Sequence, residues 1–105
     1  MGIGPIRITA QTLSVLTLFL ASADTGFAGA DIARETGLRS GTLYPLLFRL
    51  ERAGWLSSAW EDGIASEMGR PRRRTYLMTA QGRRQTQAIC AQLSEMIGGT
   101  AWQSI

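Results

Sequence analysis

Six arginines occur close together in this 105-residue chain, in a stretch with no acidic residue between Glu67 and Glu95. They are Arg70, Arg72, Arg73, Arg74, Arg83 and Arg84. An arginine guanidinium is planar and can donate two parallel hydrogen bonds to a phosphate group. Gly69 and Pro71 place the first four of these arginines in a loop and not along a helix. The stretch therefore predicts a basic loop that binds a polyanion.

A second group of residues suited to nucleic acid falls on a helix predicted from Ser40, its cap, to about Ala53. Its core face is predicted by leucines at helical spacing, namely Leu43, Leu46, Leu47 and Leu50. The outward face then carries Ser40, Thr42, Tyr44, Pro45, Phe48 and Arg49. Small hydroxyl side chains permit close approach to base edges, and the helix begins without an acid that would repel phosphate. This face is typical of a helix that enters the major groove.

The candidate DNA-binding residues come from this helix and from the basic loop. They are Arg39, Ser40, Thr42, Tyr44, Pro45, Arg49, Arg70, Arg72, Arg73 and Arg74. Taken alone, the outward face of the helix is equally consistent with an ordinary solvated surface. A charge run is more often solvated, but Gly69 and Pro71 favour a polyanion for this one. Their close succession along the chain favours nucleic acid.

The elements that must position these residues are three helices followed by two strands. Thr9 caps a first helix to about Ser22, and Ala28–Thr36 predicts a short second helix that ends at Gly37. The helix over 40–53 follows, with an irregular start expected because Pro45 removes an early hydrogen bond. In residues 55–60 and 75–78 the side chains alternate between two faces as in β-strands, and a polar loop lies between these segments. The order predicts a mainly α (α+β) fold, a winged helix-turn-helix with a two-stranded wing.

The last helix, capped by Thr79 and ending near Ile97, is predicted to form a dimer. Its apolar stripe is Ile89, Leu93, Met96 and Ile97. A second copy is the simplest cover for this stripe, and the first helix adds Leu13, Leu16 and Leu20 to the predicted homodimer interface. The predicted organisation is a DNA-binding domain over 1–79, a dimerisation helix over 80–97 and a flexible tail over 98–105.

Composition argues against several other classes of protein. The chain has no histidine and no lysine, lacks a glycine-rich phosphate loop, and has no cysteine pair for zinc, so we expect no enzyme, cofactor or metal site. The single Cys90 cannot form an intramolecular disulfide, which favours a reducing cytoplasm. The apolar stretch over 13–21 is too short to span a membrane.

Some residues receive an ordinary structural interpretation. Trp55 and Trp60 are expected to cover the core or the hairpin, and Cys90 is expected to be a small buried side chain and not an oxidation sensor. Glu61, Asp62 and Glu67 lack the spacing of a calcium loop, so we expect them to be solvated.

Several segments together resemble the PadR family of bacterial transcriptional regulators. They are residues 41–47 (GTLYPLL), 49–51 (RLE), 54–56 (GWL), 69–76 (GRPRRRTY) and 77–82 (LMTAQG). The resemblance covers residues 9–97 and is to the compact form of the family, which lacks a large C-terminal domain. It implies a dimeric winged helix, usually a repressor, that reads a palindromic operator with paired recognition helices and touches flanking DNA with its wings.

Carried over residue by residue, the resemblance places Tyr44 at the DNA surface with Ser40 and Thr42 beside it. Arg72, Arg73 and Arg74 would supply wing contacts, and Arg70 would be more peripheral. Compact multidrug-responsive members stack flat aromatic ligands between tryptophans of the paired last helices. Leu93 stands at the corresponding position here, so this mode of ligand binding is not expected, and the identity or existence of a small-molecule effector stays open.

The alternative is a winged helix that binds RNA or another protein without reading an operator. Four wing arginines favour nucleic acid over protein, and the hydroxyl side chains beside Tyr44 favour duplex DNA over RNA. The residues leave open the operator sequence, the regulated genes and whether the outcome is repression or activation.

Overall fold

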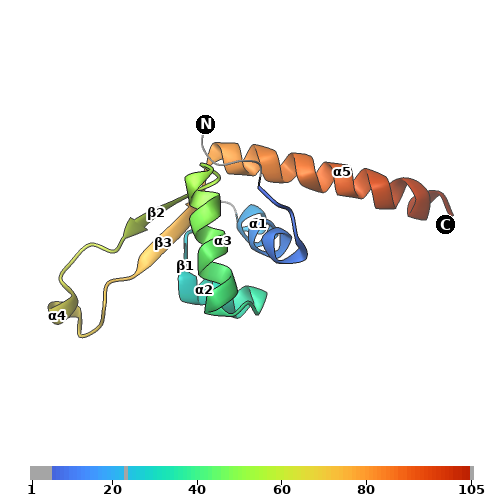
Figure 1. Ribbon diagram of the computed structural model, residues 1–105. Coiled ribbons are helices and arrows are strands. Elements are labelled where there is room, and N and C mark those ends of the chain that lie inside the picture. Colours follow the sequence, from blue (N-terminus) through green and yellow to red (C-terminus); the bar gives the residue numbers. More distant parts are fainter. Residues whose placement is uncertain (1–5, 23, 105) are drawn as a thin grey trace.

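The computed structural model describes residues 6–22 and 24–104, with residues 98–104 described as backbone only. The elements run α1 (Ala10–Ala21), β1 (Phe27–Ala28), α2 (Gly29–Thr36), α3 (Ser40–Arg52), β2 (Leu56–Trp60), α4 (Ala65–Met68), β3 (Arg74–Met78) and α5 (Ala80–Ser104). The wing and α5 project in opposite directions from a small core, so the molecule is elongated, 59 × 33 × 26 Å (Figure 1). The predicted winged helix is confirmed.

The helix starts and stops follow local chemistry. Thr9 caps α1 as predicted, since its hydroxyl accepts a hydrogen bond of 3.1 Å from the Thr12 amide. Gly37 ends α2 in the left-handed conformation, with φ 75°, and its amide donates to the Ala33 carbonyl at 2.8 Å. Thr79 likewise accepts from the Gly82 amide at the start of α5, at 2.9 Å.

The predicted start of α3 is wrong in two respects. Arg39, and not Ser40, is the N-cap, and the helix continues without a break past Pro45. A proline removes the hydrogen bond to the carbonyl four residues earlier, which here belongs to the exposed Gly41. Water can reach that residue, so the missing bond does not disrupt the helix.

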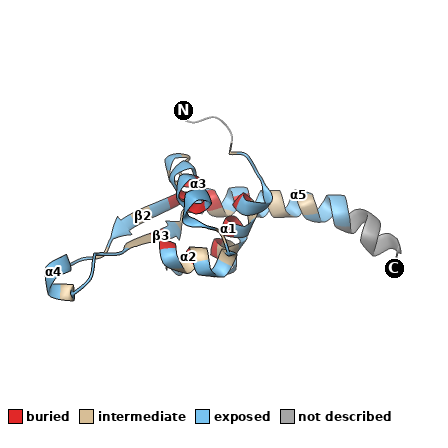
Figure 2. Cartoon of the chain, turned by 60° about the horizontal axis from the view of Figure 1, so that its bottom comes forward, coloured by how far each residue is buried: buried red, intermediate tan, exposed pale blue. Residues whose placement is uncertain are grey.

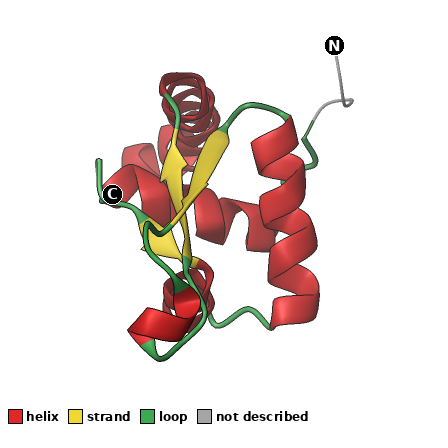
Figure 3. Ribbon diagram, turned by 90° about the vertical axis from the view of Figure 1, so that its left-hand side faces the viewer, coloured by secondary structure: helices red, strands yellow, loops and turns green. Residues whose placement is uncertain are grey.

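The predicted two-stranded wing is part of a three-stranded antiparallel sheet with the order β1-β3-β2 (Figure 3). Ala28, predicted to begin the second helix, pairs with Thr75 as part of β1, and Phe27 pairs with Tyr76. The hairpin of β2 and β3 aligns Leu56 with Met78 at its base. A two-residue strand is too short to show alternation, which is why the sequence did not predict β1.

The core lies where α1, α2, α3 and the base of the hairpin meet (Figure 2). Its buried side chains are Val15, Leu16, Phe19, Ile32, Leu43, Leu46, Leu47, Leu50, Leu56 and Tyr76. The four leucines of α3 face inward as predicted. Leu16 is completely buried within its own chain, so its predicted place in a dimer interface is wrong. Because the leucine face of α3 is buried, only the opposite face of this helix is left for a partner.

The last helix is anchored by its first two turns, where Gly82 and Thr86 are buried, and then leaves the core (Figure 1). A Cβ on Gly82 would lie 2.1 Å from the Trp55 carbonyl oxygen, so only glycine lets α5 pack this closely on the chain before β2. The helix runs to Ser104 and not to Ile97 as predicted. Two glycines at 98 and 99 cost about 1 kcal/mol each in a helix but do not forbid helical backbone angles. The predicted flexible tail is therefore helical through Ser104, while Ile105 lies outside the described residues.

Among the residues that the structure describes, no helix combines the length and the apolar character needed to cross a membrane.

Candidate nucleic-acid interface

The outward side of α3 has three distinct strips. At 100° per residue, Thr42 and Arg49 lie along one edge, while Tyr44 lies along the opposite edge. The strip between them carries Pro45 and Phe48, together with Gly41 and Arg52. All the candidate residues on and beside α3, from Arg39 to Arg49, are exposed as predicted. Each edge borders a hollow in the surface.

The first hollow lies between the start of α1 and the Thr42 edge of α3. Its volume is about 320 Å³, and it is lined by Arg7, Thr9, Gln11, Thr12, Thr42, Leu46 and Arg49. The buried Thr12 hydroxyl donates to the Arg7 carbonyl at 3.0 Å, which fixes the backbone that carries this arginine. Two guanidinium groups from distant parts of the chain thus border one hollow. The sequence did not predict Arg7 or Gln11, since only the packing of α1 on the core brings them beside α3.

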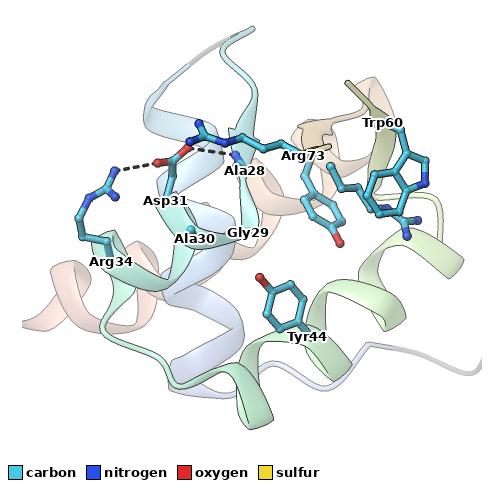
Figure 4. A pocket seen from close by; sticks show the side chains of 10 residues that line it. Ala28, Gly29, Ala30, Asp31, Arg34, Tyr44, Trp60 and Arg73 are labelled. Carbon is cyan, nitrogen blue, oxygen red and sulfur yellow. Dashed lines mark hydrogen bonds and ion pairs between the residues drawn. The ribbon is translucent and has the colours of Figure 1, made fainter. Parts of the chain in front are cut away.

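The second hollow, about 520 Å³ in volume, lies between the Tyr44 edge, the start of α2 and the wing (Figure 4). Aromatic rings of Tyr44, Trp60 and Tyr76 line it with three arginines, Arg34, Arg73 and Arg74. The backbone of residues 28–30 and the Asp31 side chain complete the lining. The hollow is therefore aromatic and mostly basic, with one carboxylate at its margin.

Close contacts hold the α2 side of this hollow. A Cβ on Gly29 would lie 2.4 Å from the Tyr44 hydroxyl oxygen, so glycine permits the first turn of α2 to touch that ring. Asp31 accepts hydrogen bonds from the Arg34 guanidinium at 2.8 Å and from the Ala28 amide at 3.2 Å. These bonds hold the pKa of Asp31 below its ordinary value, the Arg34 bond first. The carboxylate is thus partly neutralised by its own neighbours.

Glu61 organises the wing arginines, and the sequence did not predict this role. Its carboxylate accepts two hydrogen bonds from Arg70, at 2.7 and 2.8 Å, and one from the Arg73 amide at 3.1 Å. Its backbone carbonyl accepts from the Arg72 side chain at 2.8 Å. The Arg70 guanidinium is the main reason that the pKa of Glu61 falls to about 2, and Glu61 in turn raises the pKa of Arg70. The expectation that Glu61 is merely solvated is wrong, whereas Asp62 and Glu67 are exposed.

Arg74 lies on β3 and is held from several sides. Its guanidinium donates to the Ser58 hydroxyl at 2.9 Å and to the Glu51 carboxylate at 3.1 and 3.3 Å. It also lies 5.5 Å from the ring centroid of Trp60 and 5.7 Å from that of Tyr76. Arg74 thereby joins the end of α3 to the wing, a link that the sequence did not predict.

The two tryptophans differ in their surroundings. Trp55 is half-buried against the core, as expected. Trp60 is 55% exposed and lies beside Arg72 and Arg74, so of the two expected places, the core and the hairpin, it lies on the hairpin and not on the core. β2 runs outward from the core, and its buried side chain is Leu56 at the base. Trp60 instead forms part of the aromatic and basic surface.

The α5 stripe becomes more exposed toward its end. Ile89 and Leu93 are half-buried, while Met96 and Ile97 are 73% and 66% exposed. Leu13 and Leu20 on α1 are also half-buried. Cys90 is a free, partly exposed thiol and not the buried side chain expected. Within the described residues, no group of acidic or cysteine side chains is arranged to hold a metal ion.

Comparison with known proteins agrees with this geometry. The model of the Transcriptional regulator PadR-like family matches residues 27–88, which include α2, α3, the wing and the start of α5. No curated protein sequence matches the chain at a significant level.

Similar solved structures cover nearly the whole chain. The smu.1704 protein of Streptococcus mutans is 27% identical, with a TM-score of 0.67 over 95% of this chain and 97% of its own. A PadR family transcriptional regulator from Eggerthella lenta is 26% identical, with a TM-score of 0.67 over 89% of this chain and 83% of its own.

MepR of Staphylococcus aureus, in a DNA-binding conformation, shares the fold at 24% identity, with a TM-score of 0.68 over 92% of this chain. This chain spans 66% of the length of MepR. The family match covers more than half of the chain, and the matched residues carry the wing arginines and α3. The chain belongs to the PadR-like family of transcriptional regulators.

Proposed function

We propose that this protein is a sequence-specific regulator that binds double-stranded DNA as a homodimer on a palindromic operator and represses transcription. The observation that carries the proposal is the pair of arginine-bordered hollows on either side of α3. An α-helix fits the major groove, and the two phosphate backbones run along the edges of that groove. The two hollows lie on either side of the exposed strips of α3, just as the two phosphate backbones lie on either side of the groove.

Each hollow is assigned to one phosphate backbone. Arg7 and Arg49 would contact the strand beside α1, and Tyr44 and Arg73 would contact the strand beside the wing. Phosphate contacts fix the register of the helix but carry no sequence information. Thr42, at one edge, and the central strip of α3 would face the base edges.

When DNA binds, a wing arginine must leave its carboxylate partner and bond to a phosphate. Arg70 is paired with Glu61, and their side chains are 40% and 32% exposed. Water screens a pair this exposed, and a phosphate that replaces the carboxylate also bonds to the guanidinium, so the exchange costs little. Arg72 and Arg73 are exposed beside this pair. Glu61 therefore holds the wing arginines together without preventing DNA binding.

Dimerisation would bury the exposed end of the α5 stripe. Burying a Met or Ile side chain contributes about 1.5–3 kcal/mol, and Met96 and Ile97 are mostly exposed in one chain. Leu13, Leu20, Ile89 and Leu93 would complete the interface. Two copies related by a twofold axis would set two α3 helices about one DNA turn apart, which requires an inverted repeat. We place the protein in the cytoplasm, where its DNA target and its free Cys90 are compatible.

Selection from a random-sequence duplex library tests the proposal. The purified full chain is mixed with the library, and the bound fraction is sequenced. The expected result is an inverted repeat whose half-site centres are about 10 base pairs apart. Excess structured RNA should leave the selection unchanged, because the edges of α3 fit the wide major groove of B-form DNA. A bound fraction with the same sequences as the input contradicts the proposal, and loss of binding to the RNA competitor favours the RNA alternative.

A further inference from the structure

Phe48 is a large apolar side chain at the centre of the outward face of α3, and 60% of its surface is exposed. A single exposed apolar residue is ordinary on a protein surface. The position of Phe48 is not ordinary, since it lies midway between the two arginine-bordered hollows and opposite the buried leucines of α3. The surface proposed to face the bases thus has an aromatic ring at its centre.

The rest of the central strip offers few hydrogen-bonding groups. Gly41 has no side chain, and Pro45 and Phe48 have no polar side-chain atom. Arg52 is the polar member, and its guanidinium lies 5.6 Å from the centroid of the Phe48 ring. The middle of the strip can therefore contact DNA mainly through apolar surface. The apolar group displayed by base pairs in the major groove is the C5-methyl group of thymine.

Gly41 supplies a second observation from the same strip. A Cβ at this position would meet no atom within 4 Å, so the fold does not require glycine there. Glycine is a poorer helix former than alanine. Packing within the chain therefore does not explain this glycine, which lowers stability. Close approach of the helix to another molecule does explain it. Arg52 on the strip and Arg49 at its edge are positively charged, and the strip has no acid, which favours a polyanion such as DNA.

We infer that Phe48 is a specificity-determining residue that contacts the C5-methyl group of thymine in each half of the operator. The inference rests on the proposed function and adds the chemical group that is read. Pro45 supplies further apolar contact, while Arg52 holds the ring in place. The preferred half-site therefore contains a thymine opposite the middle of α3.

The experiment removes the methyl group from the DNA and the ring from the protein, separately and together. Each thymine of the selected operator is replaced in turn by deoxyuridine, which lacks only that methyl group. Burial of one such group is worth about fourfold in affinity, so wild-type protein is expected to bind about fourfold more weakly for each half-site that is changed. The Phe48→Ala variant is expected to bind the normal operator more weakly and to be insensitive to the same replacement.

A matched control separates the local contact from general effects. Leu77 is an exposed apolar residue on β3, away from α3. The Leu77→Ala variant should keep the full sensitivity to deoxyuridine, and unchanged thermal unfolding of Phe48→Ala would show that its fold is intact. Sequence-specific binding that no deoxyuridine replacement weakens overturns the inference and leaves the proposed function standing. Sensitivity that persists in Phe48→Ala also overturns it, and the absence of any preferred duplex overturns both.

Discussion

The Arg74 guanidinium on β3 hydrogen-bonds to the Glu51 carboxylate on α3 at 3.1 Å, so one ion pair joins the helix proposed to read DNA to the wing beside it. Ser58 on β2 bonds to both side chains, which ties the hairpin into the same cluster. The charge of Arg74 is balanced locally by Glu51. Because Ser58, Trp60 and Tyr76 hold Arg74 in addition to Glu51, we expect it to set the angle between α3 and the wing and not, as the sequence predicted, to contact phosphate.

Replacing Arg74 should weaken operator binding in a way that differs from the loss of a phosphate contact. Arg74→Ala is expected to lower operator affinity while leaving the salt dependence of binding unchanged. Arg73→Ala, the matched control, is expected to weaken binding to all duplexes and to reduce the salt slope by about one unit. The slopes are measured by fluorescence anisotropy over a salt series. A reduced slope for Arg74→Ala would make it a phosphate contact, contrary to this account.

The Glu61 carboxylate should make the wing sensitive to acid. Its pKa falls from the ordinary value of 4.5 to about 2, so its contribution to stability is complete above about pH 4.5 and is lost as the pH falls toward 2. Glu61→Gln removes this contribution at every pH. Its stability, measured by denaturant titration, should therefore vary less with pH than that of the wild type between pH 4.5 and 2. Glu67→Gln, another wing acid, is the control and should retain the wild-type dependence.

Two glycines in helices should respond oppositely to alanine. At Gly82 the added methyl would meet the Trp55 carbonyl, so Gly82→Ala is expected to destabilise the protein by about 1–3 kcal/mol. At Gly41 the methyl meets open space, so Gly41→Ala should stabilise the fold by up to about 1 kcal/mol. Thermal unfolding distinguishes the two. An equal effect at both positions would mean that the close approach of α5 to Trp55 is not as described.

The exposed half of α5 should hold the dimer together. Leu93→Glu places an unpaired charge in the proposed seam and is expected to give monomers by light scattering. Ala91→Glu adds the same charge at an exposed position on the side of α5 opposite the stripe and should leave the dimer intact. A Leu93→Glu variant that remains fully dimeric would show that the dimer interface does not include this stripe.

Local chemistry predicted much of the fold. Thr9, Gly37 and Thr79 mark helix ends through hydrogen bonds made within a few residues, and the spacing of the α3 leucines follows the helical period. The errors arose where local rules compete. Leu16 shares a stripe with the half-buried Leu13 and Leu20, and the sequence does not say which part of the stripe the core covers.

The candidate site was predicted less completely than the fold. The outward residues of α3 were found because burial of one helix face fixes the other. Arg7 was missed because it reaches α3 through tertiary packing of α1, and Glu61 was missed because its partner Arg70 lies across the wing hairpin. The exposure of Trp60 likewise depends on how far the hairpin extends beyond the core.

The central claim is that α3 reads bases while arginines on both of its sides hold the phosphates. The most direct measurement compares the affinity of the full chain for its selected operator with that for a shuffled duplex of the same composition, at about 0.15 M salt. The account predicts that the operator binds at least about 10³-fold more tightly and that both affinities fall as salt rises. Equal affinity for the two duplexes would contradict it.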